Sequence, residues 1–145
     1  MKQYADQRMH TAEHILNQTM VRMFGCGRCF SSHIEKKKSK CDYRFERALS
    51  EEETRELEGR VNAVIERDLP VTEEFLTREE ADLRFDTSRL PDASEMTIRV
   101  VKVGDYDACP CSGEHVQSTK AIGEFRITTV SHDNGVLRVR FKLTP

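Results

Sequence analysis

The sequence predicts an α+β fold in which helices cover a largely antiparallel sheet. Apolar residues recur at helical spacing in two segments, and two strand-like segments flank an Asn-Gly pair, which is a strong signal for a β-hairpin. Short turns between several strand-like segments favour antiparallel pairing. With 145 residues, the chain has the size of one ordinary domain, so we predict a single domain over residues 1–145.

The first predicted helix runs from about Asp6 to Phe24, where apolar residues recur at spacings of three and four. His10 and His14 lie at the edge of its apolar stripe, one helical turn apart, so both imidazoles can reach one ion. Gly25 and Gly27 end the helix, since glycine is common just beyond a helix terminus. The two glycines would also let a substrate approach the backbone closely.

Residues 28–34 and 41–45 are predicted to be strands joined by a hairpin. Ser31 and Ser32 lie on the first of them, where their hydroxyls would line a small polar pocket. A dense basic run occupies the predicted hairpin tip and consists of Lys36, Lys37, Lys38 and Lys40. Its cations either discourage edge pairing or contact a phosphate backbone, and the spacing favours neither interpretation.

The rest of the chain alternates irregularly between helices and strands. Ser50 and Glu53 form a capping box that begins a helix ending near Arg67. Thr77 caps a second short helix, which the segment 86–94 brings to an end. Strands are predicted around it from their apolar and β-branched residues, at 71–76, 96–103, 123–130 and 136–143.

A second group of potential metal ligands follows the histidine helix by about a hundred residues, in a predicted turn between two strands. This turn offers thiols and a third imidazole. Combined with the helix, it can supply the nitrogen and sulfur ligands that a tetrahedral zinc ion prefers. We predict Zn²⁺ as the cofactor and four residues as its ligands: His10, His14, Cys111 and His115.

Cys109 competes with Cys111 for the thiolate position, because it lies two residues away on the same turn. Pro110 fixes the backbone between them, so the two sulfurs are not expected to point at one metal. We favour Cys109 as a small buried residue.

Cys26 and Cys29 form a Cys-x-x-Cys pair, which would be half of a second zinc site or a redox pair. A second zinc would need two more ligands, and Cys41 and His33 are the nearby supply. A thioredoxin-like pair should open a helix, whereas this one follows a helix. We therefore favour a structural interpretation, in which the pair lines a pocket.

Glu13 lies between the two helix histidines and would act as a general base, with an exposed helix glutamate as the equal alternative. The His-x-x-Glu-His pattern also matches the inverted zincin proteases, so a metallopeptidase is an alternative function, although such proteases are far larger. Four protein ligands are typical of a closed zinc site. A non-catalytic, zinc-stabilised RNA-binding module is therefore a further alternative.

Composition excludes some partners and compartments. The net charge is -2 with 33% charged residues, so bulk electrostatics give no nucleic-acid signal and any basic contact must be local. No apolar run has membrane-spanning length and no signal peptide is recognisable, so we expect a cytoplasmic protein without a membrane partner. Five cysteines in such a chain favour ligand or redox roles over disulfides. We expect a monomer or a weak homodimer.

Three segments resemble the AlaX family of freestanding alanyl-tRNA editing proteins, namely residues 10–16, 38–43 and 104–116. That family is similar to the editing, or second additional, domains of alanyl- and threonyl-tRNA synthetases. The resemblance implies this fold, and it implies hydrolysis of the ester in mischarged tRNA(Ala), with Ser-tRNA(Ala) as the leading substrate and Gly-tRNA(Ala) as the second. It also implies the same four zinc ligands.

The sequence departs from the family pattern at two positions of the ligand turn. Ser112 and Glu114 stand where the commoner Cys-Gly-Gly-Thr-His turn has its first glycine and its threonine. The ligands are unaffected, but the polar contacts of the pocket differ. Because the chain begins directly at the histidine helix, it is similar to the short class of the family.

Overall fold

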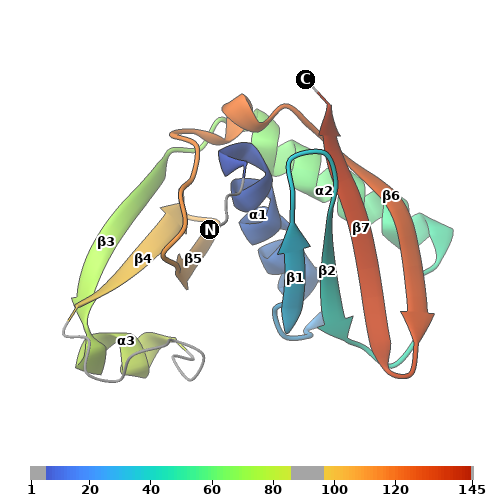
Figure 1. Cartoon of the computed structure of the whole chain (residues 1–145), viewed down its shortest axis with the longest axis horizontal. Coiled ribbons are helices and arrows are strands. Elements are labelled where there is room, and N and C mark those ends of the chain that lie inside the picture. The colour runs from blue at the N-terminus through green and yellow to red at the C-terminus, as the bar shows by residue number, and fades with distance from the viewer. Residues whose placement is uncertain (1–5, 86–96, 145) are drawn as a thin grey trace.

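The computed structural model describes residues 6–85 and 97–144 and divides their strands between two antiparallel sheets (Figure 1). The first sheet has the order β1-β2-β7-β6, with β1 Ser31–Ile34, β2 Ser39–Arg44, β6 Glu124–Asp133 and β7 Val136–Thr144. The second has the order β3-β4-β5, with β3 Val71–Thr77, β4 Thr97–Val103 and β5 Asp107–Pro110. The predicted α+β class with antiparallel pairing is confirmed.

The first helix lies between the two sheets (Figure 1). It packs against the second helix, and it also contacts β5. The second helix runs along the back of the first sheet and contacts β6. The helical segments are α1 Gln7–Phe24, α2 Glu51–Glu66, α3 Arg78–Arg84 and the short 3-10 helix η1 Thr119–Ile122.

Local signals at both ends of α1 explain its bounds. The Asp6 carboxylate accepts hydrogen bonds from the amides of Arg8 and Met9, which caps the helix start. Gly25 adopts the left-handed conformation with φ 68°, and its amide donates to the Val21 carbonyl. The capping box predicted at Ser50 is present, and the predicted cap at Thr77 is a capping box as well.

Two hydrophobic clusters support the arrangement. The larger one joins α1 and α2 to the inner face of the first sheet, and its largest fully buried side chains include Tyr43, Phe125, Phe141, Met9 and Leu16. The smaller one packs α3 onto the second sheet through Leu76, Ala81, Ile98 and Val100. Because α1 contributes its buried face to the larger cluster, the helix that carries the two histidines is held rigidly.

One strand contradicts the sequence prediction. The segment expected to be a turn contains β5, which pairs antiparallel with β4 from Val100↔Pro110 to Val103↔Asp107. It is only four residues long and ends at a proline, so neither its periodicity nor its composition identified it. The predicted end of the second short helix at 86–94, and residue Met96, lie outside the described residues.

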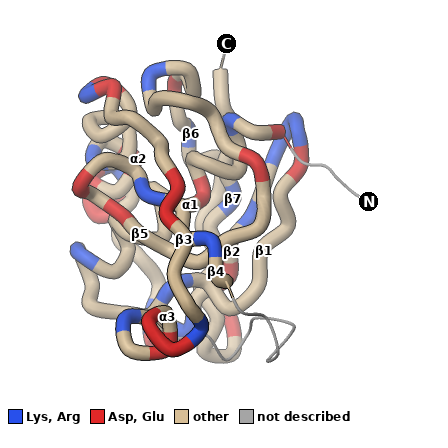
Figure 2. The backbone as a smooth tube through the Cα atoms, turned by 90° about the vertical axis from the view of Figure 1, so that its left-hand side faces the viewer, with Lys and Arg blue, Asp and Glu red and all other residues tan. Residues whose placement is uncertain are grey.

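Charge is dispersed over the surface formed by β3 and α3. Figure 2 shows acidic and basic positions mixed along α3, whereas the charged positions of β3 are acidic. Within residues 6–85 and 97–144, no helix combines the length and the apolar character needed to cross a membrane.

Candidate metal centre

The structure brings all four predicted metal ligands together. His10 and His14 project from α1, and Cys111 and His115 lie in the segment that follows β5. One potential ligand atom from each of the four residues lies within 4.8 Å of the others. The Cys111 sulfur lies 3.5 Å from His10 Nε2 and 3.6 Å from His115 Nε2.

These separations fit a tetrahedral zinc site. Zinc binds sulfur at about 2.3 Å and imidazole nitrogen at about 2.1 Å, so a tetrahedral angle places the two donors about 3.6 Å apart. The observed sulfur–nitrogen distances of 3.5 and 3.6 Å agree with that value. Three imidazoles and one thiol are also a donor set that suits zinc chemically.

Thr11 orients His115. Its hydroxyl donates to the Gln7 carbonyl at 3.0 Å, accepts from the Val116 amide at 3.2 Å and lies 2.9 Å from His115 Nδ1. A hydroxyl has a single proton, so His115 must donate from Nδ1. Nε2 of His115 then carries no proton, so its lone pair is available to coordinate a metal ion.

Asp107 is the charged neighbour of His14, at ion-pair distance and without a hydrogen bond. The buried His14 places Nδ1 3.5 Å from Asp107 Oδ2. The same carboxylate accepts from Arg28 at 2.7 Å and from Gln18 at 2.8 Å. Burial disfavours charge on both groups, but their mutual attraction prevails: the pKa of His14 is raised to about 9 by Asp107 and Cys111, and the pKa of Asp107 is held at about 2 by His14 and Arg28.

Gly113 makes room for His10. A Cβ atom at Gly113 would lie 2.0 Å from His10 Cε1, so only glycine fits against this ring. His10 Nδ1 lies 3.3 Å from the Glu114 carbonyl, and its Nε2 faces Cys111. Arg99 fixes the segment from the other side, because it donates to the carbonyls of Cys111 and Gly113 at 2.9 and 2.8 Å.

The structure selects Cys111 over Cys109 for the ligand group. Burial disfavours the Cys111 thiolate, but hydrogen bonds from the three histidines outweigh it and lower the thiol pKa to about 3. Cys109 is half-buried and is not in the group, and its burial raises its pKa to about 11. The Cys109 thiol donates instead to the neighbouring Pro110 carbonyl.

Glu13 is buried, so the alternative of an exposed helix glutamate is wrong. Its carboxylate contacts His10 and Cys29. Oε1 lies 3.7 Å from His10 Nε2, and Oε2 accepts a hydrogen bond from the Cys29 thiol at 3.6 Å.

The two residues that depart from the family pattern are exposed. Ser112 and Glu114 both lie at the surface, and the Glu114 carboxylate accepts from Gln7 at 2.9 Å. Neither side chain is one of the four grouped ligands. The departures therefore alter the rim of the candidate metal centre.

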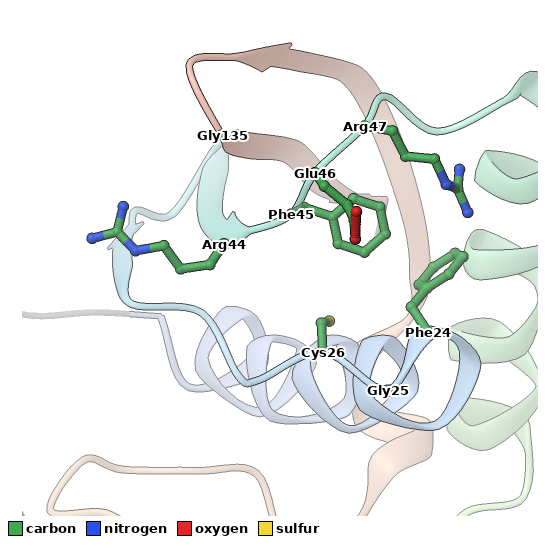
Figure 3. Close-up of a pocket in the computed structure, with 8 residues that line it drawn as sticks. All are labelled: Phe24, Gly25, Cys26, Arg44, Phe45, Glu46, Arg47 and Gly135. Atoms are coloured by element: carbon green, nitrogen blue, oxygen red, sulfur yellow. The ribbon is translucent and has the colours of Figure 1, made fainter.

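None of the predicted substrate-contacting residues belongs to the four-ligand group. Gly25 follows His14 by eleven residues, about 16 Å along the helix axis. It lines a separate hollow with Cys26, Arg44, Phe45 and neighbouring residues (Figure 3). Gly27 is exposed, and β1 carries Ser31 half-buried and Ser32 exposed. Of the basic run, the three cations at the hairpin tip are exposed, whereas Lys40 pairs with Asp42 at 2.8 Å.

Sequence reasoning missed three residues that support the ligands: Thr11, Arg99 and Asp107. Thr11 and Asp107 lie inside the two motifs that define the site. A histidine that binds a metal through one ring nitrogen commonly donates from the other to a carboxylate or hydroxyl. The presence of Thr11 and Asp107 within the motifs could therefore have indicated their roles. Arg99 lies on β4, and nothing in its sequence surroundings distinguishes it.

Fold and site together define an α+β domain with a candidate zinc centre of three histidines and one cysteine. Residues 98–139, which include two of the four ligands, match the family described as the threonyl and alanyl tRNA synthetase second additional domain.

Three alanine–tRNA ligases extend the likeness over nearly the whole chain. The ligase of Treponema denticola is 32% identical over 139 residues, 90% of this chain and 22% of the ligase. That of Methanopyrus kandleri is 32% identical over 142 residues, 92% of this chain and 15% of the ligase. That of Saccharolobus islandicus is 28% identical over 151 residues, 99% of this chain and 16% of the ligase. The resemblance predicted from the motifs is confirmed and supports an AlaX-like editing domain, which spans less than a quarter of these relatives.

Proposed function

We propose that this chain is an aminoacyl-tRNA deacylase that hydrolyses the ester of mischarged tRNA(Ala). Ser-tRNA(Ala) is the first proposed substrate and Gly-tRNA(Ala) the second. The proposal rests on one observation above the others: the four potential zinc ligands converge in a domain that is similar to part of the alanine–tRNA ligases. That relationship supports an editing role, and tRNA(Ala) is the partner that we propose.

Zinc is the ion we propose for the four ligands. If one of the four ligands is displaced, bound zinc would supply Lewis acidity toward an ester carbonyl. The chain itself prepares the donors. Thr11 holds the proton of His115 on Nδ1, the Asp107 carboxylate lies 3.5 Å from His14 Nδ1, and Gly113 leaves space for His10. These contacts support a preformed centre in which the aminoacyl ester is positioned.

We propose Glu13 as the general base. Its Oε1 lies at the margin of the ligand set, 3.7 Å from His10 Nε2. A water beside it would lose a proton to the carboxylate as the water oxygen adds to the ester carbonyl. The carbon–oxygen ester bond then breaks, and the proton passes to the leaving ribose oxygen. The products are the free amino acid and uncharged tRNA.

Selection of serine is proposed to depend on the hydroxyls of Ser31 and Ser32. A pocket built around hydrogen bonds to a substrate hydroxyl rejects alanine, because alanine leaves those groups unpaired. Gly25 and Gly27 would let the tRNA backbone approach closely. Four lysines would contact the phosphates of the tRNA. They are Lys40 and the three exposed residues of the hairpin tip, Lys36, Lys37 and Lys38.

Deacylation assays test this function. Ser-tRNA(Ala), Gly-tRNA(Ala) and Ala-tRNA(Ala) are incubated with the protein, with and without a chelator. We expect hydrolysis of the seryl ester, little loss of the alanyl ester and inhibition by the chelator. Equal rates on the seryl and alanyl esters would contradict an editing role. Binding of tRNA without turnover would identify an RNA-binding module, and cleavage of peptides would identify a metallopeptidase.

A further inference from the structure

A second group of potential ligands lies beside the first. Glu13 comes from α1, Cys29 precedes β1 and Cys41 lies on β2. One ligand atom from each lies within 4.8 Å of the others. Glu13 and Cys29 are each 9% exposed and Cys41 is 0% exposed, so this thiol–carboxylate group is enclosed by protein.

The Glu13 carboxylate is buried and accepts a hydrogen bond from a thiol. Among the described residues, its hydrogen-bond donor is the Cys29 thiol at 3.6 Å, and its ion-pair partner is His10 at 3.7 Å. A thiol is a weak donor, and His10 already turns Nε2 toward Cys111. Burying a carboxylate without strong donors or a cation is unfavourable. Arg28 and His14 interact with this carboxylate electrostatically, and a bound cation would contact it directly.

The two thiols are held in place by the surrounding framework. Cys41 lies inside the first sheet, opposite Ser32 on β1 and Val139 on β7. The Cys29 amide donates to Asn17 Oδ1 at 3.1 Å, and the same oxygen accepts from the Tyr43 hydroxyl at 2.8 Å. The sulfurs therefore reach their positions through backbone pairing, so ordering them on a cation would cost little entropy.

Cys26 is not in this group and lines a hollow, as the favoured interpretation of the Cys-x-x-Cys pair predicted, whereas Cys29 is not among the residues that line that hollow. Its thiol donates to the Met20 carbonyl at 3.7 Å, and Figure 3 shows the side chain lining the separate hollow. His33 is exposed and pairs with Glu35. Glu13 is the member of this group that the sequence did not predict, because a glutamate between two helix histidines was assigned only to the first centre.

We propose that Glu13, Cys29 and Cys41 form a second metal site for one soft or borderline divalent cation such as zinc. Two thiolates select for such cations, and the carboxylate completes a three-residue ligand set. Glu13 contributes Oε2 to this site and leaves Oε1 toward the first centre. The inference goes beyond the proposed hydrolysis, and the chain then binds two ions.

Metal stoichiometry tests the second site without reference to activity. Reduced, metal-free protein is titrated with Zn²⁺ alone, and bound metal is counted after removal of excess. The wild type should bind two equivalents. Cys29→Ser and Glu13→Gln should each bind one, while Cys111→Ser should lose the first centre and keep the second. Titration with Cd²⁺ should show thiolate-to-cadmium absorption from three sulfurs in the wild type and from one in a Cys29→Ser, Cys41→Ser double variant.

Cys26→Ser is the matched control and should retain two equivalents. Circular dichroism identifies any variant that fails to fold, and Glu13→Gln changes the least volume. One equivalent in the wild type would overturn the proposal, as would two equivalents in folded Glu13→Gln and Cys29→Ser. Loss of one equivalent in Cys26→Ser would also overturn it. None of these outcomes depends on deacylation, so the two proposals fail separately.

Discussion

Gly113 lies directly against the imidazole of His10, and a Cβ atom there would meet His10 Cε1 at 2.0 Å. Backbone and ring approach so closely that the position of one fixes the position of the other. The contact joins the two motifs that are far apart in the sequence.

Gly113→Ala should therefore displace His10 from the ligand set. We expect zinc affinity at the four-ligand centre to fall about tenfold or more, since a ligand can no longer reach its position. Competition with a chromophoric chelator measures the affinity. Gly59→Ala is the control, because nothing lies within 4 Å of a Cβ there. Unchanged affinity in Gly113→Ala would contradict the observed contact.

Thr11→Val should weaken the same centre through His115. The valine removes the acceptor of the Nδ1 proton, and loss of such a partner costs about tenfold to a hundredfold in metal affinity. Thr11→Ser keeps the hydroxyl and should restore binding. If Thr11→Val and Thr11→Ser bind zinc equally well, the hydroxyl does not orient His115.

Asp107→Asn should lower both the free energy of unfolding and the affinity for metal. The carboxylate is buried between His14 and Arg28, and breaking a buried pair leaves a charge uncompensated at a cost of about 3 kcal/mol. Chemical denaturation measures the loss. Asp105→Asn is the matched control, because its side chain is 86% exposed and its ion pair with Arg67 is 3.7 Å long. Equal stability of the two variants would disprove the role of Asp107.

His10→Ala and His115→Ala should each remove one equivalent of zinc and abolish deacylation. His33→Ala should do neither, since that histidine is exposed and pairs with Glu35. Elemental analysis and the seryl-tRNA assay provide the two readouts. Retention of all bound zinc in both ligand variants would exclude the ligand set.

Asp42 should make folding sensitive to acid. Its hydrogen bonds with Arg138 and Lys40 lower its pKa from 3.8 to about 2 against the opposing effect of burial. A lowered folded-state pKa stabilises the protein above the unfolded value, and this contribution is lost as the pH falls toward 2. Wild type should exceed Asp42→Asn in unfolding free energy near neutrality, and the difference should vanish near pH 2. A constant difference would contradict the assignment.

Local chemistry made much of the fold predictable. The capping boxes at Ser50 and Thr77 and the glycine after α1 act within a few residues, and each marks an element end in the structure. β5 was not predictable in that way, because four residues ending in Pro110 become a strand only through pairing with β4.

The residues of the candidate metal centre also differ in whether local sequence signals could predict them. The four ligands could be predicted from their residue types and spacing. Arg99 could not, because it donates to the carbonyls of Cys111 and Gly113, which come close to it only in the folded chain. Glu13 was visible as a residue but not as a buried one. Its burial depends on Cys29, which approaches α1 from another part of the chain.

The convergence of α1 with the segment after β5 also has a mechanical consequence. His10 and Cys111 are 101 residues apart in the chain, so an ion held by both closes a loop that contains most of the protein. Such a cross-link restricts the unfolded chain, as a long-range disulfide does, and its effect on loop entropy grows with loop length. The metal would thus act as a staple for both sheets, and its removal would lower the melting temperature of the whole domain.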